Sequence, residues 1–141
     1  CDAFVPNLHQ ACLRCLCKAS SGCNLNQGCD GGYCGPFSIS RIYWADAGRP
    51  VLPDDDPDRR ESFQDCARVY GCAKRVVKAY MAKYAKDCNG DGSINCDDYA
   101  MIHHNGGFSC GNPLSANFAR VYYGCRPPLT EEEAFLLSNS G

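Results

Sequence analysis

The chain has 141 residues, a formal net charge of −2 and an isoelectric point near 5.9. A nucleic-acid-binding domain is usually basic, so this charge argues against nucleic acid as a partner. No stretch approaches the ~18 apolar residues that a membrane-spanning helix needs. The length suits one domain, which we place at residues 1–125, with residues 126–141 as a C-terminal extension.

The first third of the chain predicts a short helix followed by a turn-rich segment. Residues 9–20 can form a helix that turns Leu13 and Leu16 inward. The glycine-punctuated segment 28–40 predicts a tight hairpin or loop. Residues 49–60, with three prolines and four aspartates, predict an exposed loop.

The rest of the chain is predominantly helical in pattern. Apolar residues recur every three or four positions over residues 61–86, and we expect Gly71 to divide this stretch into two helices. Shorter helices are predicted over residues 97–104 and 115–123, the latter ended by two prolines. The sequence therefore predicts a mainly helical α+β domain with a small β-hairpin.

Thirteen cysteines indicate the compartment of the protein. Cytosolic proteins rarely carry so many, and the paired C-x2-C knuckles of a zinc protein are missing, because that spacing occurs once, at Cys12 and Cys15. We therefore predict a disulfide framework in a secreted, extracellular protein. The sequence opens without a basic and then apolar leader, so we expect any signal peptide to have been removed.

The spacing of the cysteines suggests partners but leaves other connectivities open. Four pairs would close short local loops, and the cysteines left over would tie the first helix to the last third of the chain. The predicted pairs are Cys17–Cys23, Cys29–Cys34, Cys66–Cys72, Cys88–Cys96, Cys12–Cys110 and Cys15–Cys125. Cys1 is then odd, and is either free or bridges two chains in a dimer.

Residues 87–98, DCNGDGSINCDD, follow the EF-hand calcium-loop pattern. The predicted ligands are Asp87, Asn89, Asp91, the backbone carbonyl of Ser93, and Asp98. Asp98 replaces the usual glutamate, as in the dockerin version of the loop. A bound Ca²⁺ would have a structural role and no part in catalysis. The alternative is an acidic surface loop pinned by a Cys88–Cys96 disulfide.

Several ordered motifs carry a resemblance to a known family. CLRCLCKASSGC at residues 12–23, then CGPFSIS, RIYWADAGRP, YMAKYAKDC and HHNGG are similar to the invertebrate-type (i-type) lysozymes, which include the leech destabilases. The resemblance implies a lysozyme fold with about six disulfides, a role in innate immunity and cleavage of the β-1,4 bonds of peptidoglycan.

Cleavage of that bond needs two carboxylates, one of them protonated. In active members the acid is a glutamate two residues before the glycine of the S-G-C motif, and the resemblance places Ser20 there. A hydroxyl cannot replace an acid that contributes ~10²–10⁴-fold. The hairpin is shortened to CDGGYC, where Asp30 is either the second carboxylate or a turn residue.

Destabilase-like members also cleave isopeptide bonds, with a hairpin serine and a histidine before N-G-G. His104 matches the histidine, whereas Ser20 and Ser38 could replace the missing serine only if the fold brings them close. The alternative is a helix-end histidine beside the local dipole. Tyr33 and Trp44 could bind sugar rings, or they pack in the core.

The sequence favours a secreted lysozyme-like protein that lacks muramidase activity and binds glycan, such as peptidoglycan, or a host or pathogen protein. One alternative is an active glycoside hydrolase that uses a displaced carboxylate, Asp30 or Asp46. Another alternative is a destabilase-like isopeptidase.

Overall fold

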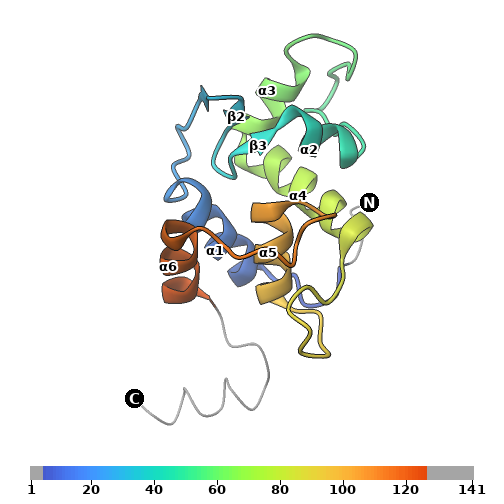
Figure 1. Cartoon of the computed structure of the whole chain (residues 1–141). Helices are drawn as coiled ribbons and strands as arrows, with labels where there is room; N and C mark the ends of the chain where they lie inside the picture. The colour runs from blue at the N-terminus through green and yellow to red at the C-terminus, as the bar shows by residue number, and fades with distance from the viewer. Residues whose placement is uncertain (1–4, 127–141) are drawn as a thin grey trace.

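The computed structural model describes residues 5–126 and confirms a mainly helical α+β fold (Figure 1). Cys1 and, apart from Arg126, the predicted C-terminal extension lie outside these residues. The helices are α1 (Gln10–Ser21), α2 (Arg41–Asp46), α3 (Ser62–Arg68), α4 (Tyr70–Tyr84), α5 (Cys96–Asn105) and α6 (Ala116–Cys125). The strands are β1 (Cys29–Asp30), β2 (Tyr33–Cys34) and β3 (Ile39–Ser40), which form one antiparallel sheet in the order β1-β2-β3.

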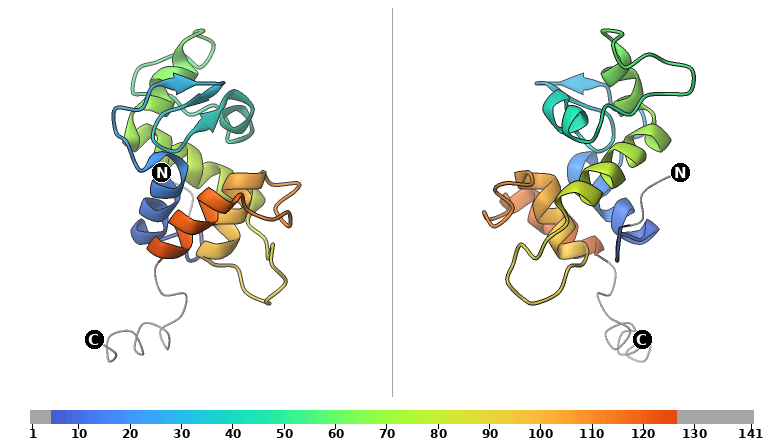
Figure 2. Two further views of the ribbon diagram at one scale, coloured as in Figure 1. Left: turned by 60° about the vertical axis from the view of Figure 1, so that its left-hand side comes forward. Right: turned by 90° about the vertical axis from the view of Figure 1, so that its right-hand side faces the viewer.

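The elements gather into two groups joined by α4. Figures 1 and 2 show α1, α5 and α6 packed together, the sheet with α2 and α3 at the other end, and α4 running between them. The longest common face is that of α1 and α6, which lie side by side. Among helices within residues 5–126, none is both long and apolar enough to cross a membrane.

Helix α1 forms because its apolar residues share one face. Leu13 and Leu16 are fully buried there, at 1% and 0% exposure. The helix ends at Gly22, whose φ of 74° is left-handed and whose N–H donates to the Lys18 carbonyl. Glycine adopts this conformation without a steric penalty, so it ends the helix cleanly, two residues after Ser20.

The hairpin and α2 follow from short local signals. Gly35 has a φ of 77°, and a Cβ there would lie 1.7 Å from the Ala67 carbonyl oxygen, so only glycine lets the sheet pack against α3. Helix α2 was not predicted, because six residues are too few to show a helical period. It begins after Ser40, whose hydroxyl accepts from the Tyr43 N–H.

The predicted division of residues 61–86 into two helices is confirmed, but the predicted position of the break, Gly71, was wrong. Gly71 lies inside α4, and the chain leaves the helical conformation at Val69, with φ −100° and ψ 119°. A disulfide between Cys66 and Cys72 spans this corner. The corner separates α3 from α4 while both remain in contact.

Six disulfides connect the described elements, and two predicted pairs were wrong. The confirmed pairs are Cys15–Cys125, Cys17–Cys23, Cys29–Cys34 and Cys66–Cys72. The structure joins Cys12 to Cys96 and Cys88 to Cys110, in place of Cys88–Cys96 and Cys12–Cys110. Cys96 begins α5 and is buried against α1, so it pairs with Cys12 and leaves Cys88 to reach Cys110.

Candidate functional site

A cavity of about 510 Å³ opens where the end of α1, the hairpin, α5 and the start of α6 meet. It brings together four of the residues predicted to take part in catalysis or binding, which are Ser20, Asp30, Tyr33 and His104. Its lining residues are Ala19, Ser20, Gln27, Asp30, Tyr33, Phe37, Ser38, His103, His104, Ser115, Asn117 and Phe118. Trp44 and Asp46 are not among them.

The two aromatic residues predicted to bind sugar differ in exposure. Tyr33 is 56% exposed at the cavity. Trp44 is only 2% exposed, its Nε1 donates to the Pro50 carbonyl over 2.6 Å, and its ring packs 5.6 Å from that of Phe63. The prediction of Trp44 as a binding residue was therefore wrong, because burying its large apolar surface stabilises the core.

Ser20 is held by hydrogen bonds on both sides. Its hydroxyl donates to the Leu16 carbonyl over 2.7 Å, and its Oγ lies 3.1 Å from Nε2 of His103. The same Nε2 lies 2.9 Å from the Phe37 carbonyl, which can only accept, so Nε2 carries the proton. The Ser20 hydroxyl thus accepts from His103 and donates to Leu16, and has no proton available for a ligand.

His103 is a site residue that the sequence prediction missed. Its Nδ1 accepts from the Tyr43 hydroxyl over 2.9 Å. Burial lowers the pKa of His103 to about 4, because the imidazolium would lose its hydration, and the ring is therefore neutral at pH 7. Burial also raises the pKa of Tyr43, so the phenol keeps the proton that it donates.

Asp30 is the one carboxylate that lines the cavity within residues 5–126. It faces Tyr33 across the first strand pair. Asp46 ends α2, away from the cavity lining, and its backbone carbonyl accepts from Lys83. Within residues 5–126 the cavity lining thus holds one carboxylate, whereas glycoside hydrolysis ordinarily uses a pair.

A second serine–histidine pair lies at the α6 side of the cavity. Asn105 donates through Nδ2 to the Asn112 carbonyl over 2.7 Å, so its Oδ1 accepts from Nδ1 of His104 over 2.8 Å. With the proton on Nδ1, Nε2 of His104 is free to accept from the Ser115 hydroxyl over 3.3 Å. The backbone N–H of Ser115 also points at Nε2, over 3.5 Å.

The serine that contacts His104 is not one of the two predicted from the sequence. Ser20 contacts His103, and the Ser38 hydroxyl donates to the Ser20 carbonyl over 3.1 Å. Ser115 caps the N-terminus of α6, where its Oγ accepts from the Phe118 N–H. Its place at the start of the predicted helix 115–123 is typical of a cap, but no local signal indicates that His104 lies opposite.

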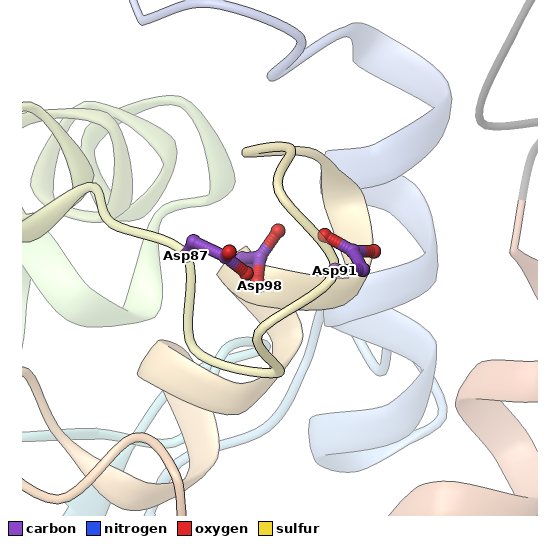
Figure 3. A group of neighbouring side chains, drawn as sticks. All are labelled: Asp87, Asp91 and Asp98. Atoms are coloured by element: carbon purple, nitrogen blue, oxygen red, sulfur yellow. The ribbon is translucent and has the colours of Figure 1, made fainter.

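The acidic loop gathers three carboxylates, as Figure 3 shows. Oxygen atoms of Asp87, Asp91 and Asp98 lie within 4.8 Å of one another. Asp98 comes from α5, is fully buried, and accepts from the N–H groups of Cys88 and Asn95 over 2.8 and 2.9 Å. These hard oxygen donors suit Ca²⁺, for which Asp98 would use its remaining lone pairs.

The other predicted ligands shape this loop through the backbone. Asn89 Oδ1 accepts from the Asp91 N–H, and Asp91 Oδ1 accepts from the Ser93 N–H. The corrected disulfides anchor the loop ends to Cys110 and Cys12, so no disulfide closes the loop on itself. The calcium site stays a prediction.

The fold and the cavity define a lysozyme-like protein with six disulfides in the described residues. The Destabilase family model matches residues 9–125, and the chain belongs to this family. It is 36% identical over 124 residues to a lysozyme of Magallana gigas, covering 84% of this chain and 78% of the relative. A Meretrix lusoria lysozyme is 38% identical over 107 residues, covering 72% and 76%.

Solved structures agree with this family. The crystal structure of Aeromonas hydrophila PliI in complex with Meretrix lusoria lysozyme matches with a TM-score of 0.67 and 33% identity. The match covers 86% of this chain and 97% of that chain. The resemblance to i-type lysozymes in sequence is therefore confirmed, together with the lysozyme-like fold.

Proposed function

We propose that this chain is a secreted lysozyme-like protein that binds glycan, in particular peptidoglycan, without muramidase activity. The observation that carries the proposal is that the hydroxyl of Ser20, which the family resemblance assigns to the position of the acid, is held by Leu16 and His103. The open cavity with the exposed ring of Tyr33 supports retention of sugar binding.

No neighbouring group can easily supply the missing proton. His103 is neutral above about pH 4, and its Nε2 proton is directed at the Phe37 carbonyl. Asp30 alone cannot act both as the acid and as the ionised carboxylate. General acid catalysis contributes ~10²–10⁴-fold, so its loss leaves little hydrolysis above background.

Binding and cleavage can be measured on the same purified peptidoglycan. We expect the protein to co-sediment saturably with it while reducing-sugar release stays at background between pH 4 and pH 8. Ser20→Glu restores a carboxyl group and should raise release, whereas Ser20→Gln, of similar size, should not. Turnover by the wild type that matches an active lysozyme and is lost in Asp30→Asn would overturn the proposal.

A protein partner is the alternative ligand. It is supported by the similarity to Meretrix lusoria lysozyme, which was crystallised with Aeromonas hydrophila PliI. Calorimetric titration of the chain with PliI tests this alternative directly. Heat of binding at micromolar concentrations supports a protein ligand, and its absence restricts the proposal to glycan.

The second candidate function is hydrolysis of an isopeptide bond. It is supported by the chain of hydrogen bonds from Ser115 through His104 to Asn105. In this reaction Ser115 Oγ attacks the carbonyl carbon and its proton passes to Nε2 of His104, which returns it to the leaving amine. Water then cleaves the acyl-enzyme, and Asn105 keeps the ring in the required tautomer.

A chromogenic γ-glutamyl amide substrate tests this second function. Activity should be lost in Ser115→Ala and in His104→Gln, and kept in Ser109→Ala, which alters an exposed serine outside the cavity lining. Activity that survives Ser115→Ala rules out this nucleophile. Absence of any activity leaves glycan binding as the function.

Calcium binding at residues 87–98 has its own test. At a Ca²⁺ concentration ~100-fold above Kd, binding to the folded state should add about 2.7 kcal/mol to the free energy of unfolding. Asp91→Asn should remove most of this gain, whereas Asp54→Asn, outside the loop, should keep it. A free energy of unfolding that is unchanged by chelation contradicts the prediction.

A further inference from the structure

A second, smaller hollow adjoins the main cavity. It has a volume of about 340 Å³ and shares Ala19, Ser20 and Asn117 with the main cavity. Its further lining includes Lys18 from α1 and Arg120 from α6. These two helices lie side by side (Figure 1). The hollow is lined by residues of both helices and extends the cavity beyond Ser20.

The hollow carries positive charge that the described residues do not neutralise. Lys18 and Arg120 are exposed, and within residues 5–126 neither is paired with a carboxylate. Arg120 instead donates to the neutral Asn117 Oδ1 over 2.7 Å. By contrast, Arg49 and Arg59 form ion pairs with aspartates.

The two ends of the combined groove therefore differ in charge. Asp30 lines the main cavity and not the hollow, and within residues 5–126 no carboxylate lines the hollow. Ser20 lies at the junction and lines both. The Ser20 hydroxyl is uncharged and therefore does not repel an anion in the hollow. Ser20 thus leaves the hollow open to anionic groups.

We propose that the hollow lined by Lys18 and Arg120 binds a carboxylate or sulfate group of an acidic glycan whose sugar rings occupy the main cavity. This inference rests on the proposed glycan binding and names the class of glycan. A guanidinium group and an ammonium group are the side chains that pair best with such anions. Asp30 at the opposite end disfavours the reversed orientation of the ligand.

Binding of four labelled oligosaccharides of equal length tests the subsite. The first is a peptidoglycan fragment with free carboxylates, the second is the same fragment with its carboxylates converted to methylamides, the third is a neutral chitin oligosaccharide, and the fourth is a sulfated glycan. The double variant Lys18→Gln/Arg120→Gln is compared with Arg14→Gln/Lys86→Gln. The comparison variant has the same net charge but leaves the hollow unchanged.

We expect the double variant to lose affinity for the carboxylated fragment by about 10–100-fold, and to bind the neutral sugar unchanged. The comparison variant should lose less than about 3-fold, as expected for remote charges screened by salt. Conversion to methylamides should weaken binding to the wild type by a similar factor. Binding of the carboxylated or the sulfated ligand that is stronger than binding of the neutral chitin oligosaccharide supports the subsite, and the ligand that binds more strongly identifies the anion.

Two results overturn the inference, and they are distinguishable. Equal affinity for acidic and neutral glycans, unaffected by Lys18→Gln/Arg120→Gln, disproves the anionic subsite and leaves glycan binding intact. No binding of any of the four oligosaccharides, together with no co-sedimentation with peptidoglycan, disproves the proposed function itself.

Discussion

Two serine–histidine pairs line one cavity, and they differ in which side chain donates the hydrogen bond. In the first, Nε2 of His103 donates to Ser20. In the second, Nε2 of His104 accepts from Ser115. The histidines are adjacent in the sequence and both belong to α5.

The difference arises from the other partners of each ring. His103 Nε2 faces the Phe37 carbonyl and must donate, whereas Nδ1 of His104 donates to Asn105 and leaves Nε2 free to accept. A histidine that accepts from a serine can activate it, but one that donates to it cannot. The comparison indicates that Ser20 is held structurally, and that Ser115 is the serine placed for chemistry.

The largest expected effect is a difference in the free energy of unfolding between variants of His103 and His104. His103→Leu leaves the Tyr43 hydroxyl and the Phe37 carbonyl without their partner, and should lower the free energy of unfolding by about 2–4 kcal/mol. His104→Leu alters an exposed side chain and should cost less than about 1 kcal/mol. Urea unfolding at pH 7 measures both. Equal losses of unfolding free energy in the two variants would mean that His103 stabilises the fold no more than His104 does.

The next effect is the part of the pH dependence of stability that His103 contributes. Its pKa is about 4 in the folded state, below the ordinary histidine value of 6.5, so the unfolded chain binds more protons between these values. Stability should therefore be full above pH 6.5 and fall as the pH drops towards 4. The loss is at most about 3 kcal/mol, reached below pH 4.

Subtraction of a variant profile isolates this effect from other groups. Asp98, whose pKa is raised by burial, and Asp55, whose pKa of about 2 is lowered by Arg59, also titrate at acid pH. Their contributions remain in His103→Gln and cancel in the difference. If wild type and variant show parallel profiles between pH 6.5 and 4, folding does not lower the pKa of His103 and the ring is not held in its neutral form by burial.

The sequence predicted the fold better than the site, because helix signals are local in the sequence whereas the contacts of the site join residues that are far apart in it. Helices 61–86, 97–104 and 115–123 were recognisable from apolar periodicity and end signals, which are local. The connectivity of Cys88 and Cys96 was not, because it depends on which side of α5 is buried against α1. Helix α2 was too short to give a pattern.

In the site, Ser20, Asp30 and His104 could be singled out because motif spacing marks their positions. Their partners could not be predicted. Ser20 and His103 are 83 residues apart in the chain, and Ser115 meets His104 only because α5 and α6 are joined by a turn that brings the helix N-terminus back. Trp44 shows the opposite error, because a residue type common in sugar sites is equally common in cores.

A smaller effect separates the two serines. Ser115→Ala removes the N-cap of α6 and should cost about 1 kcal/mol of stability, whereas Ser115→Asn should retain most of it. Ser20→Ala should cost less than about 1 kcal/mol, because His103 keeps its bond to Phe37 and alanine favours the helix. Thermal unfolding of the three variants measures this order, and a larger loss in Ser20→Ala would contradict it.

The smallest perturbation tests the proton positions themselves. Long-range ¹H–¹⁵N spectra at pH 7 should show the proton on Nε2 of His103 and on Nδ1 of His104. Tyr43→Phe should leave His103 in the same tautomer, because the Phe37 carbonyl still requires a donor. Asn105→Ala should release His104 from its tautomer, because the acceptor of its Nδ1 proton is gone. A proton on Nε2 of His104 in the wild type would reverse the second pair and remove the basis for Ser115 as a nucleophile.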